Sequence, residues 1–470
     1  MGKCLHLPMV TTIRVALVVL VAAFSLPVQA DPPEVDLGYE LRLRHEFFDT
    51  PAANPAADRD YDFGNARFRF TADVKWERFD LRGVAQAAGS FGLPANGAFG
   101  IGPVYFAAND GDENPAHLGL AELFVTYRNE GFRLYGGRMK SPSGNEIGTG
   151  VAHLDGIKKR RLAERLVGNW DWVNVGRRYD GLGASWQNDT VRLDGWGFIP
   201  LAGGVNYEDA FEQLDDLSVC GIAVTGRYGQ WLPAGELRLF AHQYDDDRPG
   251  ARAAAGGELS MTTVGSSLLW GGEDHDLLAW VAWQTGDWGP QDHDALAFFI
   301  EGGRKIALGA LTWTFRAGLA QASGGDPRDA AHGTFFNMLP TNHKFYGSLD
   351  YSAFQNLRDL YAEALITAGG PWNLRIAAHL FELEDTRDAW YGGSGAFDKE
   401  RLGFAGRRPA GGFTDDAIGQ EIDIDFGYKL PHDLRLGVGG GVFFGGDGAE
   451  QFLRAESDGS WGYVQLSWKG

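Results

Sequence analysis

Apolar and polar residues alternate along much of this chain with a period of two. From Val35 to Phe47 every second residue, apart from His45, is apolar or aromatic, and the residues between them are charged or glycine. Residues 66–76 repeat the pattern, with Arg, Asp, Lys and Thr standing between aliphatic and aromatic side chains. This period is typical of a β-strand with one apolar and one wet face, because successive side chains of a strand point to opposite sides.

Alternating segments recur to the end of the chain, and each has close to the roughly 9–11 residues with which a tilted strand crosses a bilayer. We expect about 18 of them, near residues 35–48, 64–77, 79–89, 118–128, 131–139, 178–187, 190–198, 217–228, 235–244, 258–270, 275–286, 294–306, 309–320, 356–367, 373–383, 418–429, 433–444 and 459–468.

The connections between these segments alternate in length. Short turns, such as residues 129–131, 187–189 and 430–432, separate long segments at 90–117, 140–177, 199–216, 321–355 and 384–417. Short periplasmic turns and long extracellular loops are typical of outer-membrane barrels, whereas a soluble β-sandwich or propeller would not keep this rhythm along a whole chain. The sequence therefore predicts an all-β fold, an antiparallel transmembrane β-barrel of about 18 strands.

The N-terminus carries the features of a secretory signal peptide. Lys3 and Arg14 supply positive charge, residues 15–24 are an unbroken apolar run, and Val28-Gln29-Ala30 offers a cleavage site. The run is shorter than the roughly 18 residues of a spanning helix. We expect residues 1–30 to be removed and residues 31–470 to form one barrel in the outer membrane of a Gram-negative bacterium.

Composition and motifs narrow the function. The formal net charge of −20 argues against nucleic acid as a partner. We find no His-Glu-x-x-His pair, no Gly-x-Ser-x-Gly elbow, no phosphate-binding Gly-rich loop and no paired Cys for zinc. His242 and His379 are interpreted as lumenal polar residues. We therefore predict no catalytic residue, no cofactor and no metal site, and a barrel lipase or protease is disfavoured.

The polar half of each alternation faces the lumen of a barrel, where charges set selectivity. Guanidinium groups bind carboxylates with two parallel hydrogen bonds, so a ladder of them suits an acidic polymer or anion, or else pairs with lumenal acids to stiffen the wall. The candidates from the pattern are Arg42, Arg44, Arg67, Arg69, Arg82, Arg192, Arg238 and Arg316. The basic run at residues 158–161 lies in a long loop, where we expect a solvated face, with contact to a polyanion or to lipopolysaccharide as the alternative.

Aromatic residues fall at the ends of several predicted strands, where membrane barrels carry interfacial girdles. These are Tyr61, Trp76, Trp186, Trp270, Trp461, Tyr463 and Trp468.

Residues 164–181, ERLVGNWDWVNVGRRYDG, resemble the alginate-export family of outer-membrane β-barrels, and residues 39–47, 339–350 and 418–430 agree with it. The resemblance implies a monomeric, 18-stranded diffusion channel that exports an anionic exopolysaccharide, an alginate-like polyuronate, through an arginine-lined pore. Arg165, Asp171, Arg177 and Asp180 match the family motif and are expected near the constriction, and Arg42 and Arg44 match its first strand.

The cargo stays open. Glu421, Asp423 and Asp425 stand in series on a predicted inward face, which would make the pore less uniformly positive. The alternative is a substrate-selective uptake porin for small organic anions or oligosaccharides, favoured if long loops such as 90–117 fold inward. Expected partners are the anionic substrate, outer-membrane lipid and lipopolysaccharide, with periplasmic proteins of a secretion complex as further candidates.

Overall fold

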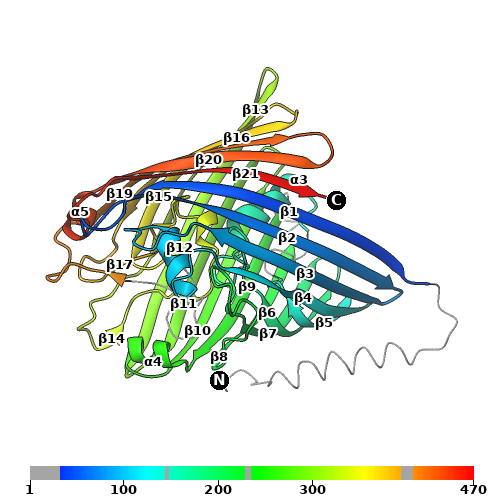
Figure 1. Ribbon diagram of the computed structural model, residues 1–470. Coiled ribbons are helices and arrows are strands. Elements are labelled where there is room, and N and C mark those ends of the chain that lie inside the picture. The colour runs from blue at the N-terminus through cyan, green and yellow to red at the C-terminus, as the bar shows by residue number, and fades with distance from the viewer. Residues whose placement is uncertain (1–31, 143–147, 228–233, 393–405) are drawn as a thin grey trace.

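The computed structural model describes residues 32–142, 148–227, 234–392 and 406–470. They form one closed antiparallel β-barrel of 18 strands, which confirms the predicted fold class. Pairing of the first strand with the last closes the barrel, and Figure 1 shows these strands, blue and red, side by side. The expected signal peptide, residues 1–30, lies outside the described residues.

Each barrel strand pairs with its neighbours in chain order. The first nine are β1 (Glu34–Asp49), β2 (Asp60–Trp76), β3 (Phe79–Phe91), β4 (Ala116–Asn129), β5 (Phe132–Met139), β6 (Tyr179–Gln187), β7 (Val191–Pro200), β8 (Leu217–Arg227) and β9 (Gly235–Asp246). The other nine are β10 (Leu259–Gly271), β11 (His275–Trp288), β12 (Gln291–Leu308), β13 (Leu311–Ala322), β15 (Leu357–Thr367), β16 (Trp372–Glu382), β19 (Ala417–Lys429), β20 (Leu434–Gly445) and β21 (Gly459–Lys469).

The smaller elements lie in the connections. The two-residue strand β14 (Ala331–His332) pairs in parallel with β12, and β17 (Trp390–Tyr391) pairs with β18 (Gly406–Arg407). The helices are α2 (Ile101–Ala108), α3 (Ala152–Ile157), α4 (Pro249–Ala255) and α5 (Asp447–Phe452), with the helical turns η1 (Lys158–Leu162) and η2 (Asn342–Lys344). No helix in the described part of the chain is long and apolar enough to cross a membrane.

Burial along the strands is the reverse of that in a soluble protein. In β19 the carboxylates of Glu421 and Asp423 are fully buried, whereas Ile422 and Ile424, which alternate with them, are each 51% exposed. The polar residues of the alternating pattern therefore face the lumen. The apolar residues face the outer surface of the barrel, where the hydrocarbon of a membrane would cover them.

The connections at the two ends of the barrel differ in length. One end has tight turns, such as residues 77–78 and 309–310, and the other has loops at 92–115, 140–178, 323–356 and 383–416. The exception at the loop end is Gly289-Pro290, which joins β11 directly to β12. We assign the short-turn end to the periplasm, as in other outer-membrane barrels.

Only part of the predicted aromatic girdle faces outward. Trp186 and Trp468 are each 42% exposed on the outer surface, as expected for an interface residue. Trp461 and Tyr463 are instead buried in the lumen, and Tyr61 packs on Phe48 and donates its hydroxyl hydrogen to the carbonyl of Phe99. Aromatic residues near strand ends in this chain thus serve both surfaces of the wall.

The long loops fold into the barrel and form a hydrophobic core there. Buried loop residues include Leu154, Val175, Phe336 and Leu349, which belong to one cluster with inward side chains of the strands. The loop of residues 92–115 takes part as well, because the Tyr105 hydroxyl accepts a hydrogen bond from the backbone N–H of Asn174. The loops therefore fill the lumen near the loop end. Inward folding of the long loops is the condition under which the sequence favours the uptake alternative.

The basic run at residues 158–161 is only partly the expected solvated face. Lys159 and Arg160 are exposed, but the expectation is wrong for Lys158 and Arg161. Lys158 and Arg161 are almost fully buried, and they pair with Glu236 on β9 and Glu301 on β12. Charges removed from water need partners, and the lumenal wall of the barrel supplies them. These pairs fasten the loop to the wall opposite β1 and β2.

The outward apolar surface gives a depth-dependent prediction. We expect Ile422→Arg, in the middle of β19, to destabilise the barrel in lipid by about 2–4 kcal/mol, because the charge enters hydrocarbon. The matched control, Leu308→Arg at the turn end of β12, should cost only about 0–1 kcal/mol. Urea titration of barrels folded into vesicles measures both; equal effects at the two positions would contradict the assigned membrane-facing surface.

Candidate functional site

A cavity of about 850 Å³ occupies the lumen at the short-turn end. It lies between β1 and β2 on one side and the turn ends of β15, β16, β19 and β20 on the other. We call it the vestibule. Its charged lining consists of nine basic residues, Arg42, Arg44, Arg67, Arg69, Lys140, Lys344, Lys429, Arg435 and Lys469, and three acidic ones, Glu40, Glu164 and Asp171.

The arginines of β1 and β2 bind the backbone of the loop at residues 140–178. Arg42 donates from Nη1 to the carbonyl oxygens of Asp171 and Trp172 at 3.1 and 3.0 Å, and from Nη2 to that of Val173 at 3.0 Å. Arg44 donates to the carbonyl oxygen of Trp172 at 3.1 Å. Arg42 and Arg67 face each other across the strand pair, so both reach the same loop segment. The guanidinium fork, with five donors in one plane, suits a row of carbonyl oxygens.

Asp171, one of the three acids of the vestibule, pairs with three basic side chains. Its Oδ1 lies 3.0 Å from Nη2 of Arg69 and 3.2 Å from Nη1 of Arg178, and its Oδ2 pairs with Nζ of Lys140. Burial alone would raise the pKa of this carboxyl group, but the charges of Arg178, Lys140 and Arg69 hold the pKa well below its ordinary value. Asp171 therefore remains ionised throughout the physiological pH range.

Trp172 lies between two charged or titratable side chains. The guanidinium carbon of Arg44 is 3.6 Å from the centroid of the Trp172 ring, and the His343 ring stacks on Trp172 at 3.9 Å. His343 in turn pairs through Nδ1 with Asp350 at 2.8 Å. Cation–π contact and stacking fix the indole at the inner wall of the vestibule.

The two loops at 140–178 and 323–356 join inside the barrel. Val167 and Leu339 form a parallel β-bridge, in which Gly168 N–H donates to the Leu339 carbonyl at 2.7 Å and Leu339 N–H donates to the Leu166 carbonyl at 2.9 Å. We call this contact the loop joint. Arg177, fully buried, also donates to the Leu339 carbonyl, at 2.8 Å.

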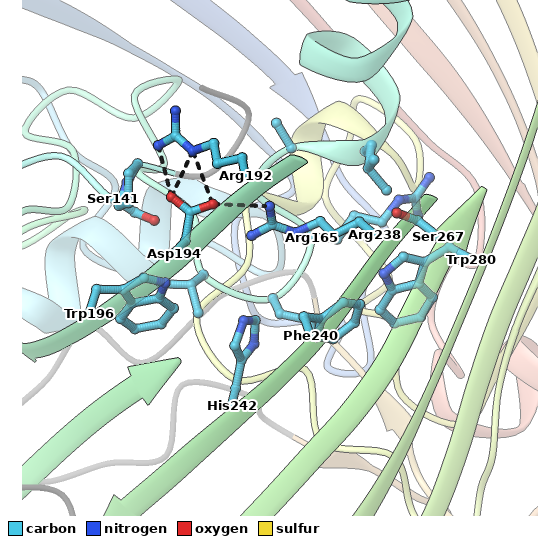
Figure 2. A pocket seen from close by; sticks show the side chains of 15 residues that line it. Ser141, Arg165, Arg192, Asp194, Trp196, Arg238, Phe240, His242, Ser267 and Trp280 are labelled. Atoms are coloured by element: carbon cyan, nitrogen blue, oxygen red, sulfur yellow. Dashed lines mark hydrogen bonds and ion pairs between the residues drawn. The ribbon is translucent and has the colours of Figure 1, made fainter. Parts of the chain in front are cut away.

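The predicted site residues are divided among several places. Arg42, Arg44, Arg67, Arg69 and Asp171 line the vestibule. Arg165, Arg192 and Arg238 border a second, smaller cavity of about 70 Å³. In Figure 2, Arg192 and Arg238 both reach Asp194, beside the rings of Trp196 and Phe240.

The other four candidates line neither cavity. Arg177 belongs to the loop joint. Arg82 is 44% exposed beside Asp73, and Asp180 pairs with Arg138 at 2.8 Å. Arg316 is buried between Glu301 and Asp276, at 2.8 and 2.6 Å. These side chains are held by ion pairs or backbone contacts within the wall and the loops.

Sequence reasoning missed five bases of the vestibule, Lys140, Lys344, Lys429, Arg435 and Lys469. Lys429, Arg435 and Lys469 stand at the ends of β19, β20 and β21 that lie on the short-turn side, and only closure of the barrel gathers them around one cavity. Their strand-end positions could have been noted from the sequence. Lys140 and Lys344 lie in long loops, for which the alternating pattern gives no direction.

A closed barrel with a charged inner cavity is the architecture of an outer-membrane channel, and the family match supports that class. The chain belongs to the alginate-export family, whose family model, described as "Alginate export", matches residues 34–464. A search of curated proteins finds no match to the chain.

Solved outer-membrane channels share the fold at low sequence identity. OpdK of Pseudomonas aeruginosa, crystallised with vanillate, is 14% identical with a TM-score of 0.53, and the match covers 93% of this chain and 98% of that one. OccAB4 of Acinetobacter baumannii is 9% identical with a TM-score of 0.55, covering 95% and 100%. These likenesses concern the fold alone.

The loop joint depends on Gly168, which gives a second prediction. A Cβ on this residue would lie 2.9 Å from the Glu164 carbonyl oxygen and 3.0 Å from the Thr341 backbone nitrogen, so Gly168→Ala should force the two loops apart. We expect a larger single-channel conductance in planar bilayers. Gly156→Ala is the matched control in the same loop, because a Cβ there meets no atom within 4 Å. Conductance of Gly168→Ala equal to that of Gly156→Ala would show that the joint does not restrict the pore.

Proposed function

We propose that this protein is an anion-selective outer-membrane channel that exports an acidic exopolysaccharide of the alginate type. The observation that carries the proposal is the position of the basic vestibule. Nine Lys and Arg residues line the cavity at the short-turn end, which we assign to the periplasm. An exported polyuronate would enter from this side, and its carboxylates would meet a concentration of positive charge at the first step.

The local charge opposes the charge of the whole chain. The formal net charge is −20, yet the vestibule holds three times as many bases as acids. Low-dielectric walls focus the field of charges in a cleft, which raises the local concentration of a counter-ion by about tenfold or more. The acidic strand β19 does not offset this. The Glu421 carboxylate accepts the N–H of Leu349 and is fully buried, and Asp425 pairs with Arg375 at 2.9 Å.

A second candidate is uptake of small organic anions through the same vestibule. The inward packing of the loops favours it, because the loop joint and the core around it leave less room for a polymer than an open lumen would. The two candidates share anion selectivity and differ in whether the loop joint must separate.

Charge reversal at the vestibule tests the selectivity. We expect the double variant Lys429→Glu and Arg435→Glu to move the reversal potential in a KCl gradient toward cation preference, because both side chains line the opening. Arg78→Glu in the β2–β3 turn is the matched control, since it changes charge at the same end of the barrel outside the cavity lining. An equal shift in the control, or none in the double variant, would count against a selective vestibule.

Locking the loop joint separates the two candidates. We expect a disulfide between cysteines at Val167 and Leu339, which are bridge partners, to abolish passage of long oligouronates while monomeric uronate still permeates. Reduction should restore passage of the oligomer, and the single-cysteine variants are the controls. If the oxidised protein still carries the oligomer, the joint does not lie on the polymer path.

A further inference from the structure

Asp171 differs from the other acids of the vestibule in how it is held. Its carboxylate is 32% exposed toward the cavity and contacts cations from three places: Arg69 on β2, Lys140 at the start of the loop and Arg178 at its end. Glu40, by contrast, stands in the wall on β1 and pairs with Arg67 and Lys469. Asp171 is thus a carboxylate on a loop, placed in a cluster of donors that opens to the vestibule.

The loop is also held by contacts that do not involve the Asp171 side chain. The backbone carbonyls of residues 171–173 receive hydrogen bonds from Arg42 and Arg44, and the side chain of Asn174 donates to the carbonyls of Ala66 and Gly89, each at 3.0 Å. Arg178 keeps a second partner, Glu122, at 3.1 Å. These contacts would keep the surrounding backbone bound if the carboxylate of Asp171 rotated away from the cluster.

Resting on the proposed function, we infer that Asp171 occupies the position where a substrate carboxylate binds, and that the substrate displaces it from Arg69 and Lys140. The two groups are chemically equivalent ligands for the same donors, since each offers two oxygens to guanidinium and ammonium. The ligand class is a carboxylate-bearing sugar or small organic acid that reaches the cluster from the vestibule.

Displacement of a tethered competitor explains how a strongly basic site avoids trapping its cargo. A channel conducts only if its ligand binds well enough to enter and weakly enough to leave. A carboxylate tethered beside its binding site has an effective concentration on the order of millimolar, so it lowers the apparent affinity for a free carboxylate. After each substrate carboxylate moves on, Asp171 returns to the donors.

The test measures the oligogalacturonate concentration that reduces the KCl current by half. This concentration is compared between the unsubstituted mature chain and its full-length variants. The oligogalacturonate is added from the short-turn side. We expect Asp171→Asn to lower the half-blocking concentration several-fold, because the competing carboxylate is gone. Asp171→Glu keeps the competitor and should stay near the unsubstituted protein. Glu40→Gln removes one negative charge from the same cavity at a different pair, and its half-blocking concentration should change much less.

Three results would overturn the inference. One is an equal effect of Asp171→Asn and Glu40→Gln, which would indicate only a general change of charge. Another is an unchanged or higher half-blocking concentration for Asp171→Asn. The third is a rise in KCl conductance of Asp171→Asn without tighter block, which would make Asp171 a loop anchor. Failure of the proposed function is distinct, because there the unsubstituted protein itself lacks anion preference and is not blocked.

Discussion

The hydrogen bonds from the guanidinium groups of Arg42 and Arg44 to the carbonyl oxygens of residues 171–173 are the constraint on which the rest of this structure depends. A loop that enters a barrel carries backbone polar groups away from water, and each must find a partner. The two arginines meet that need at 3.0–3.1 Å from β1, which pairs on both sides within the closed sheet. Once residues 171–173 are fixed, Asp171 faces the cations and Trp172 stacks on His343.

This gives the arginines of the first two strands two roles. They bind the loop through its backbone, and Arg42, whose partners are carbonyl oxygens and the side-chain amide of Asn174, leaves its positive charge uncancelled on the vestibule wall. Arg44, Arg67 and Arg69 are partly offset by Glu46, Glu40 and Asp171. Other acids of the lumen pair with bases outside the vestibule. Glu301 and Asp276 neutralise Arg161 and Arg316 deep in the opposite wall. A local excess of nine bases over three acids is how a strongly acidic chain maintains a basic vestibule.

The barrel could be predicted from the sequence because its signal is local. The alternation from Val35 to Phe47 names the inward residues of β1 without reference to any other strand, and the same holds for β2. The loops could not be predicted, since their partners lie far away in the chain: Arg42 contacts a residue 131 positions later, and Arg177 one 162 positions later. The family motif at residues 164–181 marked the correct loop, but its members have different roles. Asp171 faces the vestibule, whereas Arg177 is buried in the loop joint.

The most direct test of the account is the sidedness of block in a planar bilayer, with the unsubstituted mature chain inserted in a known orientation under a KCl gradient. The account predicts an anion-selective reversal potential. It also predicts that oligouronate added at the short-turn side blocks the current at a lower concentration than the same oligouronate added at the loop side. A cation-selective or unselective pore, or block that is equal from the two sides, would contradict the claim that the basic vestibule is where an anionic substrate enters.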